Sequence, residues 1–170
     1  AQKFKNKVDG KELIVVVNHF KSKGCRNAKG TIYDDQKDGQ GCYNAKRLAQ
    51  SEALLDFTAE LKKSYKNDRM ILIGDFNAYS MEDPIQKIIS GGFEQLTSGS
   101  YSYVYKGMFG SLDHAFVSPT LKGDITKAEK WHINADEPKM LDYRTHNPTG
   151  LYQENPFRSS DHDPVLIGIR

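Results

Sequence analysis

The sequence has no long run of apolar residues, and its longest uninterrupted run is the five residues from Leu13 to Val17. A membrane-spanning helix needs about 20 such residues. Low-complexity tracts and internal repeats are also missing, and 38% hydrophobic and 27% charged residues are typical of globular proteins. We therefore expect residues 1–170 to form part of a single domain that has no membrane-spanning segment.

Strong charge of one sign is missing as well. The net charge is +2 and the pI is near 8.4, below the value of about 9 that would itself indicate nucleic-acid binding. The sequence also has no Walker A lysine loop, no HExxH, no GxSxG and no GxGxxG after a strand. The charge thus permits a nucleic-acid ligand without indicating one, and four common classes of enzyme are disfavoured.

Cysteine is scarce, because Cys25 and Cys42 are the only two. They bracket a polar, glycine-rich stretch with almost nothing able to form a core. We expect a disulfide between them, worth about 3 kcal/mol for a loop of this length, and hence an oxidising compartment. The alternative is two unrelated thiols in a cytosolic protein. A zinc site is disfavoured because there is no CxxC or Cys/His cluster.

Two apolar, β-branched segments, Leu13 to Val17 and Met70 to Ile73, are predicted to be buried strands. Between them, Asn44 is expected to cap a helix with apolar residues at helical spacing, namely Ala49, Ala53, Leu54, Phe57 and Leu61. Strand, helix and strand in this order indicate an α/β arrangement.

The second half of the chain has a different pattern. A short helix is expected to start at Asp83 and Pro84 and to end at the glycines 91–92. Alternating or apolar segments predict mainly antiparallel strands at 101–105, 113–117, 128–133 and 165–169. Residues 134–160 contain three prolines and little periodicity, so we expect one long surface loop there, of the kind that is often functional.

Polar side chains capable of chemistry follow several of these strands. Asp75 and Asn77 are two positions apart, so in an extended segment both would point the same way, the carboxylate toward a hard cation and the amide toward a phosphate oxygen. The alternative is an Asx turn. Asp161 and His162 come just before the last strand, where a histidine beside carboxylates can act as an acid or base near neutral pH. The alternative there is a charged turn with a surface histidine.

Two further strand ends carry His19 and Asp113. Alone, His19 would more often be a hydrogen-bonded structural histidine, and Asp113 would be unremarkable. Four strand ends with Asp, Asn or His nevertheless form a joint pattern, because loops that converge at one sheet edge are where active sites are usually built.

In chain order, these motifs resemble those of the endonuclease/exonuclease/phosphatase superfamily, which has the DNase I-like fold. They are a strand ending in Asn18-His19, GDFN at 74–77, SLDH at 111–114 and SDHDP at 160–164. Secreted bacterial nucleases of this superfamily are similar also in NHFKSKG at 18–24, GQGCYNAKR at 39–47 and PFRSSDHDP at 156–164. The resemblance implies an α/β, or α+β, four-layer sandwich of which this chain supplies the C-terminal half.

The resemblance also implies roles for individual residues. His162 would be the base that activates water, and Asp113 would orient it. Asp75 and Asn77 would hold the water or metal and a non-bridging oxygen, Asp161 would help to bind the cation, and His19 would stabilise the phosphate or protonate the leaving oxygen. The cation would be Mg²⁺, with Mn²⁺ and Ca²⁺ as alternatives. At the start of the first helix, Lys46 and Arg47 are candidates for contacts with neighbouring phosphates.

One feature of the family is missing from the sequence. Family members begin with another half of the sandwich, which carries an early Asn and a metal-binding Glu. No segment that resembles this half precedes Leu13. We expect the N-terminal half on a separate fragment or chain, and we expect this chain alone to be inactive and to expose an apolar sheet face.

The leading functional hypothesis is a secreted bacterial nuclease, extracellular or periplasmic, that hydrolyses DNA with a divalent metal, with RNA as an alternative substrate. One alternative is a phosphoesterase of the same superfamily that acts on a phospholipid or inositol phosphate, against which the sequence suggests no exposed hydrophobic hairpin and no membrane contact. Another is a non-catalytic binding module. The alternation of Tyr101, Tyr103 and Tyr105 would suit base stacking, although one packed strand face is the commoner meaning.

Overall fold

The computed structural model describes residues 1–142, 150–151 and 154–170. Its central element is a five-stranded sheet with the strand order β1-β2-β3-β7-β4. These strands are β1 (Gln2–Lys5), β2 (Glu12–His19), β3 (Met70–Asp75), β7 (Asp113–Val117) and β4 (Glu94–Gln95). Strands β2 and β3 are parallel, and the other neighbours pair antiparallel. The mixed α/β architecture predicted from the sequence is therefore confirmed.

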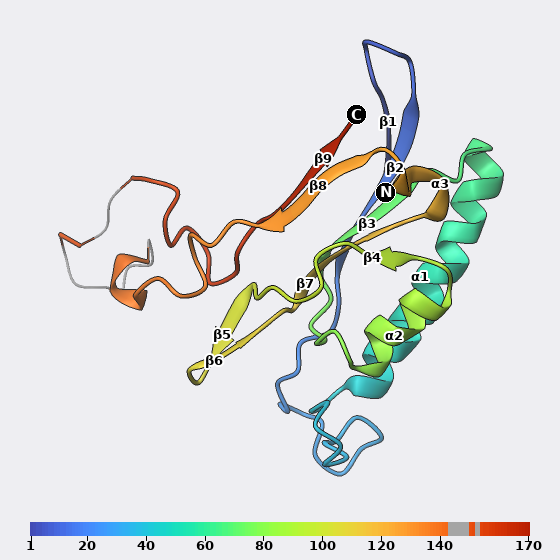
Figure 1. Cartoon of the computed structure of the whole chain (residues 1–170). Helices are drawn as coiled ribbons and strands as arrows, with labels where there is room; N and C mark the ends of the chain where they lie inside the picture. Colours follow the sequence, from blue (N-terminus) through green and yellow to red (C-terminus); the bar gives the residue numbers. More distant parts are fainter. Residues whose placement is uncertain (143–149, 152–153) are drawn as a thin grey trace.

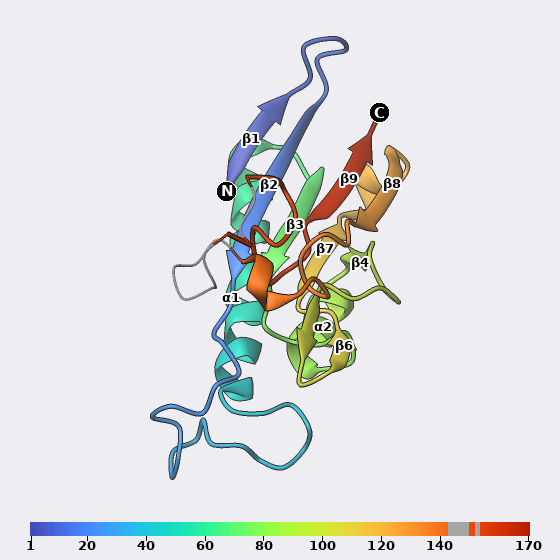
Figure 2. The same cartoon turned by 90° about the vertical axis from the view of Figure 1, so that its left-hand side faces the viewer.

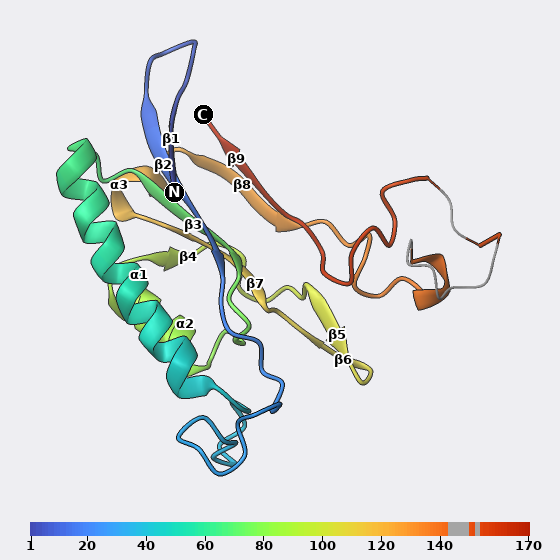
Figure 3. The same cartoon turned by 180° about the vertical axis from the view of Figure 1, so that it is seen from behind.

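Two helices, α1 (Asn44–Tyr65) and α2 (Asp83–Ser90), cover one face of this sheet (Figure 1). A short helix α3 (Pro119–Lys122) follows β7. The antiparallel pair of β8 (Ile125–Lys130) and β9 (Val165–Ile169) lies on the opposite face, as the view from behind also shows (Figure 3). A hairpin of β5 (Tyr103–Tyr105) and β6 (Met108–Gly110) extends away from the sheet. A 3₁₀ turn η1 (Lys139–Leu141) lies between β8 and β9.

Alternation along the strands creates a core on each side of the sheet. Toward the helices, the side chains of β2, β3 and β7 form one buried cluster with those of α1 and α2, including Ile14, Val16, Leu72, Phe116, Leu54 and Ile88. On the other face, Ile71, Val117 and Leu121 pack against residues of the β8–β9 pair. Because successive strand residues point to opposite faces, odd-numbered residues of β2, β3 and β7 share the face that is turned away from α1.

Glycine is required at position 74, the last residue but one of β3, directly before Asp75. Its φ is +137°, and a Cβ atom there would lie 2.1 Å from the carbonyl oxygen of Asn18. Only glycine permits both this backbone conformation and this close approach to β2. The glycine of the GDFN segment thus allows the ends of β2 and β3 to lie side by side.

The first helix differs from its prediction in two respects. Its N-cap position is Tyr43, with φ +62°, and within the described residues no side chain caps the helix, so Asn44 is its first residue and not its cap. The expected apolar stripe is also displaced, because Ala49, Ala53 and Phe57 are exposed. The buried positions are instead Arg47, Ser51, Leu54, Thr58 and Leu61. The polar members of this stripe bond to backbone carbonyl groups, which lets them replace apolar residues in the interface.

The predicted disulfide is confirmed. Cys25 and Cys42 are bonded, with Cα atoms 5.1 Å apart. The loop that they close lies beyond the N-terminal end of α1 (Figure 2). Ala28 and Cys42 are fully buried and pack against Tyr43. The polar loop therefore has a small apolar centre of its own in addition to its covalent closure.

The predicted strands are all present, with shifted bounds except at 113–117 and 165–169, and three strands of the structure, β1, β4 and β6, were not predicted. The strand expected at 128–133 is β8, which spans 125–130 and so leaves the only tryptophan outside it. Strand β6 pairs with β5 through the two-residue turn of Lys106 and Gly107, both with positive φ, as expected for such hairpins. Within the described ranges, no helix is long and apolar enough to cross a membrane.

The segment 134–160, predicted as a surface loop, is partly an internal element. Residues 143–149 and 152–153 of it lie outside the described residues. Among the others, Asn134, Ala135, Asp142 and Arg158 are buried. Asp163 explains part of this burial, because its carboxylate accepts backbone N–H groups from residues 133–135. The loop is therefore fixed to the segment that precedes β9.

Candidate active site

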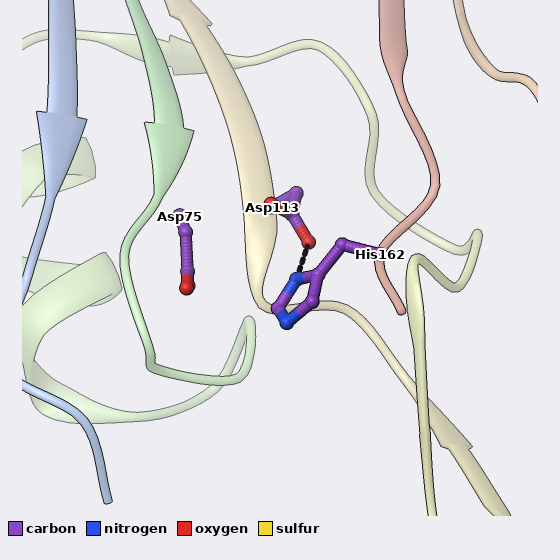
Figure 4. A group of neighbouring side chains, drawn as sticks. All are labelled: Asp75, Asp113 and His162. Atoms are coloured by element: carbon purple, nitrogen blue, oxygen red, sulfur yellow. Dashed lines mark hydrogen bonds and ion pairs between the residues drawn. The ribbon is translucent and has the colours of Figure 1, made fainter. Parts of the chain in front are cut away.

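Strand register brings three of the predicted site residues to one edge of the sheet. In the β2–β3 ladder His19 lies opposite Asp75, and in the β3–β7 ladder Asp75 lies opposite Asp113. All three are odd-numbered, so their side chains lie on the face turned away from α1. His162, from the segment before β9, reaches the same place. One ligand atom each of Asp75, Asp113 and His162 can be chosen so that all lie within 4.8 Å of one another (Figure 4).

Asp113 and His162 form a hydrogen-bonded pair. The Nδ1 atom of His162 lies 2.7 Å from Oδ2 of Asp113 and donates to it, which leaves Nε2 as the acceptor of the ring. The hydroxyl of Ser102 donates to the same carboxylate oxygen at 2.7 Å and accepts the backbone N–H of Asp113. The ring of Tyr103 packs on the imidazole at 4.6 Å. The imidazole is therefore held in one orientation and one tautomer.

The charge on His162 responds to these neighbours. Burial lowers the pKa of His162, but the hydrogen bond to Asp113 and the charges of Asp113, Asp75 and Asp161 raise it, and the net pKa lies above the usual 6.5. Burial raises the pKa of Asp75, the backbone N–H of Asn77 lowers it and the charge of Asp113 raises it, with a net increase. A carboxylate with a raised pKa beside another carboxylate is stabilised by a positive charge placed between them.

Asn77 does not lie as the extended-strand prediction required. β3 ends at Asp75, and Asn77 has a left-handed backbone with φ +48°. Its backbone N–H and side-chain Nδ2 donate to the two oxygens of Asp75, at 2.7 and 3.0 Å, and Nδ2 also donates to the carbonyl of Phe20. The expectation of two parallel side chains is therefore wrong because the chain turns after Asp75. The geometry is the Asx turn, and Asn77 fixes the carboxylate of Asp75.

His19 and Asp161 lie at the margin of the cluster. The Nε2 atom of His19 is 3.6 Å from Oδ2 of Asp75, and its side chain is 79% exposed. Asp161 is half-buried and lies outside the group of three that could hold a metal among the described residues. It lines a neighbouring cavity together with Tyr103.

The prediction that Arg47 contacts phosphate is wrong. Arg47 is fully buried, and its guanidinium donates to the carbonyl oxygens of Cys42, Gln40 and Lys21. Burial lowers its pKa, but an arginine with these partners stays charged and fixes the end of the disulfide loop to α1. Lys46 is exposed at the start of the same helix, so its contact with phosphate stays a prediction.

Four residues that support the site were missed from the sequence. Ser102 bonds Asp113, as described above. Asp163 is buried and also bonds Nδ1 of His132 at 2.8 Å. Lys130 is buried and donates to the carbonyl of Ser100 and the hydroxyl of Ser111, and burial lowers its pKa to about 8. His114 is buried behind the sheet edge. Asp163 and His114 had a signal, because each adjoins a predicted site residue, in the SDHDP and SLDH motifs respectively.

The β5–β6 hairpin contradicts a further expectation. Its side chains Tyr105, Met108 and Phe109 are 49%, 66% and 61% exposed. The sequence suggested no exposed hydrophobic hairpin, and that expectation is wrong. The period-two alternation of tyrosines does not continue as a packed strand face, because the chain turns back at Lys106 and Gly107.

Comparison with solved structures shows which proteins share the fold of this chain. No family model and no curated protein matches the sequence. Among solved structures, the chain is similar to a mannosyl-6-phosphatase of Bacteroides thetaiotaomicron, with a TM-score of 0.58 and 18% identity over 98% of this chain and 54% of the other. A beta toxin of Staphylococcus aureus has a TM-score of 0.58 and 19% identity, over 96% and 55%. An endonuclease/exonuclease/phosphatase of Bacteroides vulgatus has a TM-score of 0.54 and 15% identity, over 99% and 54%.

At these identities the structural similarity establishes a shared fold, and it assigns no activity or substrate to this chain. The chain spans about half the length of the structures that it matches.

Proposed function

The chain has the endonuclease/exonuclease/phosphatase fold, and from this premise we propose that it carries the base, its orienting carboxylate and metal-binding groups of a secreted, divalent-metal-dependent nuclease. The observation that carries the proposal is the hydrogen bond from Nδ1 of His162 to Asp113, beside Asp75 at the same sheet edge. A histidine held in this way has a defined acceptor nitrogen, which is what a general base needs.

In the proposed reaction, Nε2 of His162 removes a proton from water as the water oxygen attacks phosphorus. Asp113 stabilises the imidazolium that forms and stays ionised. The bond from phosphorus to the leaving oxygen breaks, and a proton from His19 or from solvent completes the alcohol product. Asn77 keeps the carboxylate of Asp75 oriented toward the reaction centre.

A divalent cation fits the proposed site, because carboxylate oxygens suit Mg²⁺. A cation would also reduce the repulsion between the carboxylates of Asp75 and Asp113. Asp75, in the group of three, is the first proposed ligand, and Asp161, which lies outside that group, is the second. Mg²⁺ is the proposed ion, with Mn²⁺ or Ca²⁺ as alternatives. The bound cation would act as a Lewis acid toward charge on the phosphoryl oxygens.

We also propose that further polypeptide, expected to be the N-terminal half of the same domain, completes the site. The sheet face away from α1 carries Leu13, Val15 and Val17 of β2, and Val17 is 75% exposed. An apolar side chain so exposed beside a candidate site is suited to burial by a partner segment. Full metal-dependent activity of this chain alone would contradict the proposal.

The location is a proposal as well. The disulfide between Cys25 and Cys42 supports an oxidising compartment, such as the exterior of a bacterial cell or a periplasm.

The test is hydrolysis of supercoiled DNA, RNA, sphingomyelin and bis(p-nitrophenyl) phosphate by the protein in its full natural length, with and without EDTA. We expect metal-dependent cleavage of DNA that His162→Gln reduces by at least about a hundredfold. The exposed β5–β6 hairpin is the observation that keeps a lipid substrate in the assay. Cleavage of sphingomyelin alone would overturn the nuclease in favour of a lipid phosphodiesterase, and no hydrolysis with any metal would favour a binding module.

A further inference from the structure

A cavity of about 680 Å³ lies next to the candidate active site. One wall is the β5–β6 hairpin, including Tyr105 and Phe109, and the opposite wall is the segment from Ala135 to Asp142, with Arg158 and Asp161 also contributing. No step of the proposed reaction uses this cavity.

The cavity is continuous with the cluster around His162. Tyr103 lines it and also packs on the ring of His162 at 4.6 Å. Asp161, the neighbour of His162 in the chain, lines it as well. A ligand that extends from the reacting phosphorus by one unit in this direction would therefore enter the cavity.

The two walls differ in chemistry. On the hairpin, Phe109 is 61% exposed and its ring is held edge-to-face by Tyr101 at 4.8 Å, while Tyr105 is 49% exposed. The two rings lie on opposite faces of the hairpin, because Phe109 pairs with Val104 and Tyr105 pairs with Met108. A flat ligand can therefore stack on only one of them, and Phe109 is the one whose ring is held by a neighbour. The opposite wall contains ionisable side chains, namely Asp136, Glu137, Lys139 and Asp142.

Arg158 gives the cavity a buried positive group. It is 3% exposed and lies in a left-handed conformation with φ +54°. Its Nη1 donates to the carbonyl of Asn134 at 2.5 Å, and its Nε lies 4.0 Å from Oδ2 of Asp142 in a buried ion pair. Within the described residues this Nε makes no hydrogen bond, so a polar ligand group in the cavity could accept one from it.

We propose that this cavity binds an unpaired nucleotide next to the scissile phosphate, with its base stacked on Phe109. The inference rests on the proposed nuclease function and assigns a substrate class to it. A base has an apolar face for the hairpin and hydrogen-bonding edges for the opposite wall. A base inside a duplex cannot present its face, so single-stranded DNA or an extruded base is the preferred substrate.

A lipid chain suits the cavity less well. It would place an apolar surface against the ionisable wall and would remove water from charged side chains, at a cost in free energy. The exposed hairpin alone would fit a lipid surface, and the ionisable wall is what favours the nucleotide.

The experiment measures binding of labelled single-stranded and duplex DNA by fluorescence anisotropy in EDTA, where metal-dependent cleavage cannot occur. We expect Phe109→Ala to weaken single-strand binding by about tenfold or more and to change duplex binding by less than about twofold. Phe109→Tyr should retain single-strand binding, whereas Phe109→Leu should lose it, because an apolar side chain without a flat ring cannot stack. Ile32→Ala, at a 76% exposed apolar residue of the disulfide loop, is the matched control and should change neither.

Equal effects of Phe109→Ala on both DNA forms, or no effect, would overturn the inference. Retention of binding by Phe109→Leu would also overturn it. A parallel sedimentation assay with phosphatidylcholine/phosphatidylserine vesicles would overturn it in favour of a lipid surface if Phe109→Ala abolished vesicle binding and left DNA binding intact. Failure of the nuclease proposal would be seen separately, as a lack of metal-dependent hydrolysis of bis(p-nitrophenyl) phosphate and DNA.

Discussion

Acid is expected to destabilise the chain through a buried histidine that the proposed reaction does not use. His114 is fully buried, and its ring lies beside those of Phe76 and Phe116. Its Nε2 donates to the carbonyl of Ala78 at 2.8 Å, and its Nδ1 accepts from Nε2 of Gln95 at 2.8 Å. Both ring nitrogens thus suit the neutral form. Burial lowers the pKa of His114 from 6.5 to about 4, against a smaller opposing effect of the Ala78 hydrogen bond.

The magnitude follows from the difference between the folded and unfolded states. Between pH 4 and 6.5 the unfolded chain binds a proton at His114 that the folded chain does not, so stability falls as the pH falls through this window. A decrease of about 2.5 pKa units at 1.36 kcal/mol per unit corresponds to about 3 kcal/mol. The contribution is fully present above pH 6.5 and lost below about pH 4. Set against a total stability of about 5–15 kcal/mol, this loss is large.

Urea unfolding followed by circular dichroism from pH 7 to pH 4 tests this reasoning. His114→Gln keeps one donor and one acceptor and cannot titrate, so its stability should fall by about 3 kcal/mol less than that of the wild type over this range. His19→Gln, at an exposed histidine, is the control and should follow the wild type. Parallel curves for the wild type and His114→Gln would refute the argument, as would an NMR titration of His114 with a midpoint near 6.5.

Three further outcomes are expected. Gly74→Ala should destabilise the fold by roughly 3 kcal/mol or more in thermal unfolding, because a Cβ would meet a carbonyl oxygen at 2.1 Å, whereas Gly92→Ala, with open space around it, should cost about 1 kcal/mol; similar losses would contradict the account. Replacing both disulfide cysteines with serine should lower the free energy of unfolding by about 3 kcal/mol, and an unchanged urea midpoint would argue against it. Asp113→Asn should reduce kcat at least a hundredfold and shift the acidic limb of the pH–rate profile to lower pH, since Asp113 raises the pKa of His162; Asp9→Asn is the surface control, and an unshifted limb would contradict the pairing.

The parts of the fold that were predictable from the sequence are those in which local pattern and burial agree. Strands β2, β3 and β7 are short apolar runs with buried side chains, so periodicity located them. Strand β9 was located by its apolar run, although its residues are half-buried or exposed. Polar residues directly after such runs indicated where the sheet edge would carry chemistry. That edge does collect His19, Asp75 and Asp113.

The errors arose where a side chain's environment is set by distant segments. Arg47 is a basic residue at a helix start, yet the carbonyl groups that bury it belong to a loop whose path depends on the disulfide. Asn77 follows a strand that was expected to continue, but the chain turns and the amide reaches back to Asp75. Lys130 and Ser102 support the site through partners about ten to thirty positions away, and their own sequence surroundings carry no sign of those contacts.

The pairing of His19, Asp75 and Asp113 across three neighbouring strands has a consequence for how such a protein can change. Their relative positions are fixed by backbone hydrogen bonds between strands, and a slip of one residue would turn a side chain to the opposite face. The chemistry is thus tied to the hydrogen-bonded centre of the main sheet. The β5–β6 hairpin, by contrast, pairs only with itself among the described strands. Selection for a new substrate can therefore act on the hairpin while the strand ladder, and the reaction that it supports, stays the same.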